Sequence, residues 1–89
     1  MRLEVYSIFD NKVDVYNQPL FAKNINELKE NLIANKENLI KMGINPLDYE
    51  IYELGKYETN LGKFYMYDAP KHISSLEIFT KTEEKENGK

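Results

Sequence analysis

A single amphipathic stripe between Asn24 and Met42 is the feature that most constrains the fold of this chain. Apolar residues recur there at steps of three and four, the period of an α-helix that buries one face. They are Ile25, Leu28, Leu32, Ile33, Leu39 and Ile40. The sequence therefore predicts one helix over residues 24–42, which must bury its stripe against strands contributed by the rest of the chain.

Signals at both ends of this stripe agree with a helix. Asn24 can accept a hydrogen bond from the free backbone donors of the first turn, and Glu27 stands at the spacing of a capping box. At the other end Gly43 suits the left-handed residue that closes a helix, and Ile44 can pack back on the last turn. Pro46 prevents the helix from continuing.

The segment before the helix has the two-residue period of β-strands. Residues 2–9 alternate and are rich in β-branched and aromatic types, and residues 13–16 resume the alternation after a polar break at 10–12. This pattern predicts a first hairpin. Because Pro19 lacks a backbone donor, we expect the second strand to lie at an edge or to bulge there, with residues 20–22 continuing it.

A second hairpin is predicted after the helix, from residues 49–54 and 63–67. Gly62 can supply a positive φ in the loop between them. The segment 68–70 contains a proline and is expected to end this hairpin. For residues 73–79 the apolar spacing fits both a strand and a short helix, and we interpret it as a strand.

Length and composition limit the chain to one domain. With 89 residues, 42% of them hydrophobic, it can build one core, and a domain this small has a narrow margin of stability that a symmetric partner would widen. We predict a single α+β domain over residues 1–80, with an antiparallel sheet of four to five short strands in two hairpins packed against the one amphipathic helix. Residues 81–89 are charged and polar, and we expect a disordered tail.

The sequence disfavours a metal site, a cofactor site, contact with a membrane and a catalytic site. The chain has no cysteine and a lone histidine, His72, so we expect neither a metal site nor a cofactor. No run of 18 apolar residues occurs, and we expect no contact with a membrane. Glu50 and Glu53 should point to opposite faces of a strand, and Ser74 has no general base near it in sequence. We therefore expect no catalytic residues and no enzymatic activity.

Tyrosine is the one residue type in excess, with seven among 89 residues. Several lie in the second hairpin among lysines, and such rings can stack on bases while ammonium groups contact phosphates. The candidate nucleic-acid-binding residues are Lys56, Tyr57, Lys63, Tyr65 and Tyr67. Tyrosine also favours strands and half-buried surfaces, so a purely structural role is the alternative.

Alternation on the last strand of this hairpin separates two sets of side chains. Phe64 and Met66 share one face, and Tyr65, Tyr67 and Lys63 share the other. We expect the helix to cover Phe64 and Met66 and to leave the tyrosine face toward solvent or a partner. Because tyrosine is enriched at interfaces, that face could equally form a homodimer.

Five segments in order resemble a known family: residues 6–10 (YSIFD), 12–13 (KV), 18–21 (QPLF), 46–55 (PLDYEIYELG) and 62–64 (GKF). The chain is similar, from residue 1 to about residue 79, to the small nonstructural protein of gokushoviruses, tailless single-stranded DNA phages of the Microviridae. None of these motifs is catalytic. The resemblance implies a phage protein in the host cytoplasm that is assigned to viral DNA synthesis or packaging or described as DNA-binding, with no established site residues.

Two functions remain open at this point. The first is a non-enzymatic accessory protein that binds single-stranded DNA through the tyrosine and lysine face, although a net charge of −3 opposes strong binding to phosphates. The second is a protein-interaction module that recruits or inhibits a phage or host replication protein or a capsid-assembly protein. It would use the same face or the edge strand around Pro19.

Overall fold

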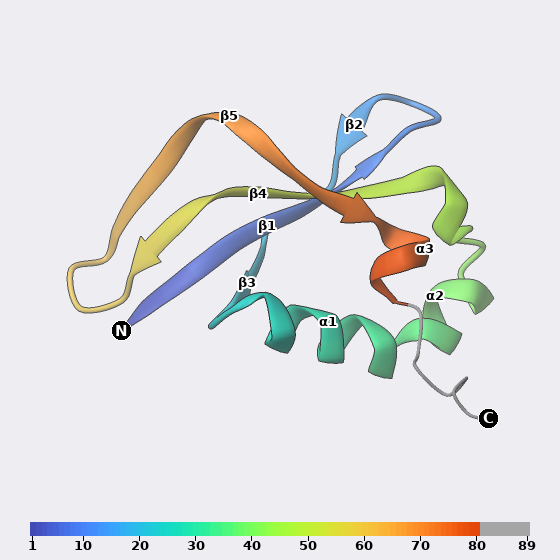
Figure 1. Cartoon of the computed structure of the whole chain (residues 1–89), viewed down its shortest axis with the longest axis horizontal. Helices are drawn as coiled ribbons and strands as arrows, with labels where there is room; N and C mark the ends of the chain where they lie inside the picture. Colours follow the sequence, from blue (N-terminus) through green and yellow to red (C-terminus); the bar gives the residue numbers. More distant parts are fainter. Residues whose placement is uncertain (81–89) are drawn as a thin grey trace.

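A curled, five-stranded antiparallel sheet forms the body of the computed structural model, which describes residues 1–80 (Figure 1). Its strands are β1 (Arg2–Asp10), β2 (Val15–Tyr16), β3 (Leu20–Ala22), β4 (Tyr49–Glu58) and β5 (Lys63–Ser75). They lie in the order β2-β1-β4-β5, and β3 pairs with the other half of β1. The sheet curls into a half-barrel. The predicted tail, residues 81–89, lies outside the described residues.

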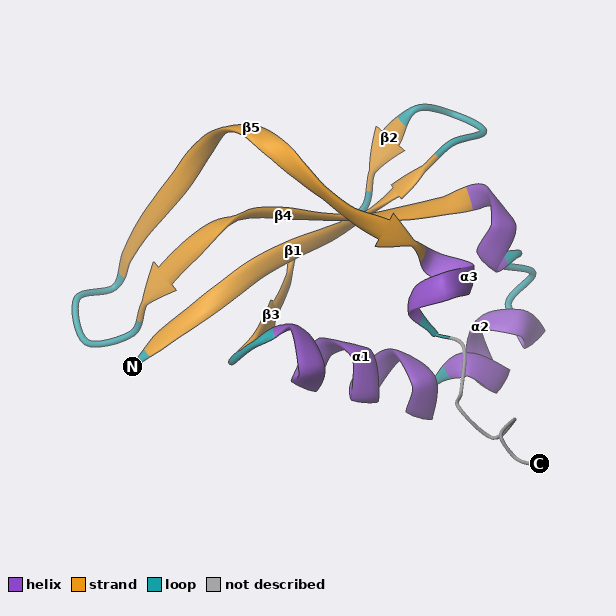
Figure 2. Cartoon of the chain, in the orientation of Figure 1, coloured by secondary structure: helices purple, strands orange, loops and turns teal. Residues whose placement is uncertain are grey.

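All helices of the described chain lie on one side of this sheet (Figure 2). They are α1 (Ile25–Ala34), α2 (Lys36–Lys41), the 3-10 helix η1 (Pro46–Asp48) and the short α3 (Leu76–Phe79). The predicted α+β class, with an antiparallel sheet of four to five strands, is confirmed. None of the helices within residues 1–80 is long and apolar enough to cross a membrane.

The predicted single helix is broken at Asn35, so the expectation of one continuous helix over 24–42 is wrong. Asn35 leaves helical geometry at φ −102° and ψ 10°, and its side-chain amide donates to the carbonyl of Asn31 at 2.8 Å. Asparagine competes with the backbone for hydrogen bonds in this way and interrupts helices. As a result only α1 buries residues of the stripe, Leu28 and Leu32, while Ile40 on α2 is exposed.

Both predicted helix ends are confirmed, although Glu27 bonds to Lys23, the residue before the cap, and not to Asn24 as a capping box requires. The Asn24 side chain accepts from the backbone N–H of Glu27 at 2.9 Å, and the Glu27 carboxylate accepts from the backbone N–H of Lys23 at 2.6 Å. Gly43 has φ +84°, and the N–H of Ile44 donates to the carbonyl of Leu39 at 3.0 Å. These bonds satisfy backbone groups that a helix end leaves free.

Strand β5 runs much further than the sequence predicted. The segment 68–70, expected to end the hairpin, is a bulge within the strand, where the pairing with β4 jumps from Met66 to Lys71. Pro70 is tolerated there because β5 is an edge strand. The last segment is also corrected: β5 ends at Ser75 and residues 76–79 form α3, whose first turn the Ser75 hydroxyl caps.

The core lies between the sheet and the helices. Its buried residues come from three strands and two helices: Tyr6, Ala22, Leu28, Leu32, Ile51, Leu76 and Phe79. We call the side of the sheet that carries this core the inner face and the opposite side the outer face. The hairpin of β4 and β5 extends beyond α1, so at its tip the inner face is left uncovered (Figure 1).

Candidate nucleic-acid interface

Strand register decides on which face each candidate residue lies, because directly opposite residues in an antiparallel pair share a face. Lys56 on β4 pairs with Tyr65 on β5 and with Glu4 on β1. Glu4 is two residues before Tyr6 on the same strand, so it points to the same face as this core residue. These side chains therefore lie on the inner face. By the same register Lys63, which pairs with Glu58, also lies on the inner face. Three of the candidate residues, Lys56, Lys63 and Tyr65, therefore share this face.

Tyr57 is separated from the other candidates. It pairs with Phe64, and both rings contact Phe21 of β3 on the outer face, with centroid distances of 4.6 Å between Tyr57 and Phe64 and 5.9 Å between Tyr57 and Phe21. Tyr67 lies on the inner face with the other three, since its hydroxyl donates to Glu53, the partner of the core residue Tyr6. The structure therefore brings together four of the five predicted residues. Tyr57 belongs to a different surface.

The expectation that the helix covers Phe64 and Met66 is wrong. Phe64 is 52% exposed and Met66 is 49% exposed, and both pair with residues of the outer face. Alternation correctly divided the side chains of β5 into two sets. It could not say which set faces the helix, because that depends on the register with β1 and on how far α1 reaches along the sheet.

At the uncovered end of the inner face lies an open pocket of about 360 Å³, lined by the inner-face residues Arg2, Lys56, Tyr65 and Tyr67. Met66, which stands between the two tyrosines on the edge strand β5, also lines it. Tyr65 and Tyr67 are both exposed. Each of their rings has a cation near its face: Lys63 Nζ is 5.4 Å from the Tyr65 centroid and Lys56 Nζ is 5.9 Å from the Tyr67 centroid. Arg2 lies 6.0 Å from the Tyr65 centroid. The pocket thus combines flat aromatic surface with cations within cation–π range.

Beneath the pocket a carboxylate holds two of these groups in place. Glu53, only 8% exposed, accepts from the Tyr67 hydroxyl at 2.7 Å and from Lys56 Nζ at 3.0 Å. Lys56 also lies 3.5 Å from Glu4, whose carboxylate accepts from the buried hydroxyl of Tyr6. Tyr67 and Lys56 therefore have fixed positions, and Lys56 is neutralised from two sides.

The ionisation of these groups follows from the same contacts. Burial alone would raise the pKa of the Glu53 carboxyl, but the hydrogen bonds from Tyr67 and Lys56 outweigh it and the pKa lies below its ordinary value. The bond to Glu53 raises the pKa of Lys56 and of the Tyr67 hydroxyl. Burial, followed by the bond to Glu4, raises the pKa of Tyr6. At neutral pH the network holds charged Glu53 and Lys56 beside uncharged tyrosines.

Two cations at the pocket are less constrained than Lys56. Arg2 Nε lies 3.6 Å from Glu58, and the Arg2 side chain is 60% exposed. Lys63 makes no ion pair with any carboxylate of residues 1–80. Since exposed ion pairs are weak, Arg2 and Lys63 are the groups available to an anionic ligand.

Sequence reasoning missed Arg2, Glu4 and Glu53 as parts of this site. They come to the pocket because β1 pairs with β4 in a register that places Arg2 opposite Glu58 and Tyr6 opposite Glu53. A bulge in this pairing between Val5 and Tyr6 sets that register. No local pattern in the sequence predicts the register between two strands that lie this far apart along the chain.

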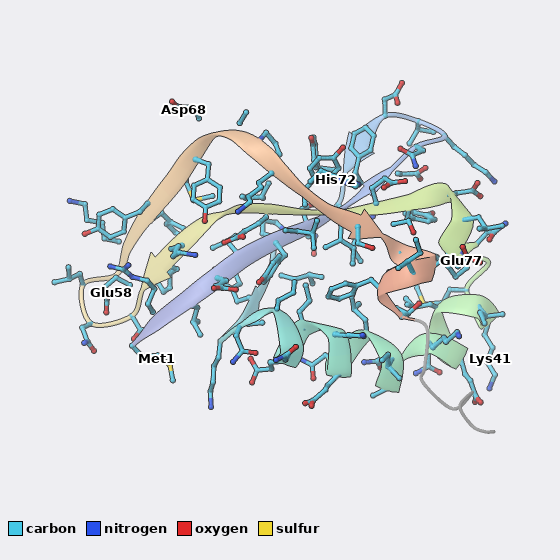
Figure 3. The ribbon with its side chains drawn as sticks, in the orientation of Figure 1. Met1, Lys41, Glu58, Asp68, His72 and Glu77 are labelled. Atoms are coloured by element: carbon cyan, nitrogen blue, oxygen red, sulfur yellow. The ribbon has the colours of Figure 1, made fainter. Side chains whose placement is uncertain are left out.

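The other titratable residues singled out from the sequence lie elsewhere. Glu50 pairs with Phe9 on the outer face, so its predicted separation from Glu53 is confirmed. His72 lies on the side of the sheet away from α1 (Figure 3), where its Nε2 is 2.7 Å from the Glu50 carboxylate. Within residues 1–80 no three His, Asp or Glu side chains gather as a metal site requires.

Fold and pocket together define a small α+β protein with an aromatic, cation-edged surface at one end of a curled sheet. The chain belongs to the Phage ORF5 protein family, whose model matches residues 3–79, and it is therefore a phage protein. Searches of curated proteins and of solved structures found no match.

Proposed function

We propose that this phage protein is a non-enzymatic accessory protein of a gokushovirus, a single-stranded DNA phage of the Microviridae. In this proposal it acts in the host cytoplasm in the synthesis or packaging of viral DNA, by binding single-stranded DNA at the inner-face pocket. The observation that carries the proposal is the placement of two exposed tyrosine rings beside cations: Tyr65 and Tyr67 with Arg2, Lys56 and Lys63. The family membership and the resemblance to gokushovirus nonstructural proteins support the phage context.

Stacking supplies most of the affinity in this proposal. Each base that stacks on an aromatic side chain contributes about 1–3 kcal/mol, and the pocket offers two such rings. The Tyr67 hydroxyl is engaged with Glu53, which leaves the face of its ring for a base. Stacking does not distinguish sequences strongly, so we expect binding with little base preference.

Phosphate contacts contribute less, because the cations are few. If Arg2 and Lys63 each contact one phosphate, the logarithm of the association constant falls with the logarithm of salt concentration at a slope of about −1.4. Lys56 adds nothing while Glu53 and Glu4 neutralise it. The proposal therefore predicts binding that is weakly salt-dependent for a nucleic-acid-binding protein.

The test is a fluorescence-anisotropy titration of a labelled single-stranded oligonucleotide at several salt concentrations. The Tyr65→Ala and Tyr67→Ala double variant should weaken binding while the fold, checked by circular dichroism, is kept. Tyr57→Ala is the matched control, since it removes a tyrosine of the same hairpin from the outer face. Unchanged affinity in the folded double variant, or an equal loss with Tyr57→Ala, contradicts the assigned surface.

A second candidate function is favoured by the free edge of the sheet. Strand β5 spans Lys63–Ser75 at the end of the strand order, so one row of its backbone donors and acceptors has no strand partner within residues 1–80. An extended segment of a phage or host replication protein, or of a capsid-assembly protein, could add a strand there. Such binding would depend little on salt, and the wild-type chain would then bind no oligonucleotide even at low salt.

A further inference from the structure

The outer face of the sheet is covered by no helix within residues 1–80, yet it carries two rows of aromatic rings. One row crosses four strands through Tyr16, Phe9, Tyr52 and His72, with neighbouring centroids 4.6, 5.8 and 5.2 Å apart. The second row joins Phe21, Tyr57 and Phe64. We use the name outer aromatic face for these seven residues together with Met66.

Two buried side chains of β1, Val5 and Ser7, lie under this face. Val5 is 1% exposed but is not part of the main core, and it pairs with Phe21 on one side and Gly55 on the other. A second side chain, Ser7, is fully buried on the same side of β1 and donates to the carbonyl of Asn17. The outer aromatic face is therefore an ordered surface and not a loose scatter of exposed residues.

The exposed apolar area of this face is that of an interface. Phe21, Phe64, Met66 and Tyr16 are 46, 52, 49 and 42% exposed. With about 200 Å² for each full side chain, they alone present roughly 400 Å². The largest apolar patch of a typical monomer is about 300–600 Å² and is often functional. A standard interface buries about 800 Å² on each partner, a little over half of it apolar, so these residues approach the apolar area of one side of an interface.

The low charge of the outer aromatic face indicates which kind of partner can cover it. Among the paired residues of the outer face only Glu50 and His72 are charged or chargeable near neutral pH, and they are bonded to each other, so the paired part of the face carries at most one net charge. These paired residues include no lysine or arginine for the phosphates of a nucleic acid. Two copies of a chain with net charge −3 repel one another, and a nearly neutral face is where they can meet at the lowest cost.

The inner-face pocket is a poorer place for self-association. Two copies meeting there would have to remove three cations and two partly exposed carboxylates per copy from water: Arg2, Lys56, Lys63, Glu4 and Glu58. Removing charges from water costs more than their mutual attraction returns unless every group is paired in good geometry. Among its paired residues the outer aromatic face carries one such pair, Glu50 and His72, which are already bonded to each other.

We infer that a second copy of this chain covers the outer aromatic face, forming a two-fold symmetric dimer. The arrangement buries the exposed rings of both copies and adds stability to a small domain. It leaves the two inner-face pockets open on opposite sides of the dimer. The inference is independent of what those pockets bind.

The test compares two neighbouring residues of β5 that are similarly exposed and lie on opposite faces. Phe64→Asp and Tyr65→Asp introduce the same charge; the side chains that they replace are 52% exposed at position 64 and 43% exposed at position 65. Sedimentation equilibrium over micromolar to near-millimolar concentrations should show a wild-type dimer. Phe64→Asp should weaken dimerisation by at least roughly 30-fold, the factor of a hot-spot aromatic, while Tyr65→Asp leaves it nearly unchanged.

A second measurement covers the case in which Phe64→Asp does not fold. The chain has no cysteine, so Phe64→Cys and Tyr65→Cys each provide one thiol for maleimide labelling. Labelling at position 64 should slow as protein concentration rises, and labelling at 65 should not. A wild-type monomer at all concentrations, a dimer unaffected by Phe64→Asp, or equal protection of both thiols would overturn the inference and leave the face to a different protein.

Discussion

Replacing Glu53 by glutamine is the sharpest test of how the inner face works. The glutamine carbonyl can still accept from the Tyr67 hydroxyl, which Glu53 bonds at 2.7 Å. The change removes the charge that neutralises Lys56 at 3.0 Å and leaves only Glu4 at 3.5 Å. Lys56 then becomes available to a phosphate beside the two rings.

The magnitudes follow from these contacts. A third phosphate contact changes the salt slope from about −1.4 to about −2.1, and affinity at low salt rises. The lost charge-assisted hydrogen bond lowers the free energy of unfolding by about 1–2 kcal/mol, at the low end because exposure of Lys56 allows solvent to screen the pair. Anisotropy titrations over a salt series measure the slope, and urea denaturation measures the stability.

Glu50→Gln is the matched control for this prediction. It removes a carboxylate from the same strand and changes the net charge by the same amount, but it lies on the outer face beside His72. We expect it to leave the salt slope unchanged. If both variants steepen the slope equally, the effect comes from net charge alone and the reasoning about Lys56 is refuted; an unchanged slope in Glu53→Gln refutes it as well.

Four further predictions concern stability. Gly55→Ala should lower the free energy of unfolding by about 1–3 kcal/mol in urea denaturation, since a Cβ there would lie 2.5 Å from the backbone oxygen of Tyr65. Because the pKa of Glu53 is lowered in the fold, its contribution to the free energy of unfolding is present above the ordinary carboxyl value of 4.5 and should be lost as pH falls below that value. The pKa of Tyr6 is raised in the fold, so its contribution to the free energy of unfolding should be lost as pH rises above 10.0. Thermal melts across pH test both predictions. Asn24→Ala should cost about 1 kcal/mol by removing the cap of α1, again measured in urea, and an unchanged midpoint would contradict the capping role.

Local signals in the sequence sufficed where one segment decides its own structure. The caps at Asn24 and Gly43 were predictable because they use residues within one turn of the helix end. Asn35 carried a weaker signal of the same kind, since asparagine disfavours helix interiors, and it was outweighed by the apolar stripe around it. The α3 segment was ambiguous because four residues are too few to establish a period.

The candidate site depends on information that no single segment carries. A two-residue period showed that Tyr65 and Tyr67 share a face, but the face toward the helix is set by pairing across β1, β4 and β5. Bulges between Val5 and Tyr6 and after Met66 shift that pairing. This is why Arg2 and Glu53 were missed and why Tyr57 was grouped with residues that it does not contact.

The net charge of −3 is compatible with a nucleic-acid interface once the charges are placed on the fold. Phosphate affinity depends on the cations that an anionic ligand can reach at the surface in question. At the pocket these are Lys63 and the exposed Arg2, whose only ion pair within residues 1–80 is the exposed one with Glu58. A ligand whose bases are free to stack gains more from Tyr65 and Tyr67 than from two phosphate contacts. Duplex DNA hides its base faces and would offer only the phosphates. Under the proposed function, the same charge balance therefore disfavours duplex DNA and favours single strands as the ligand of the pocket.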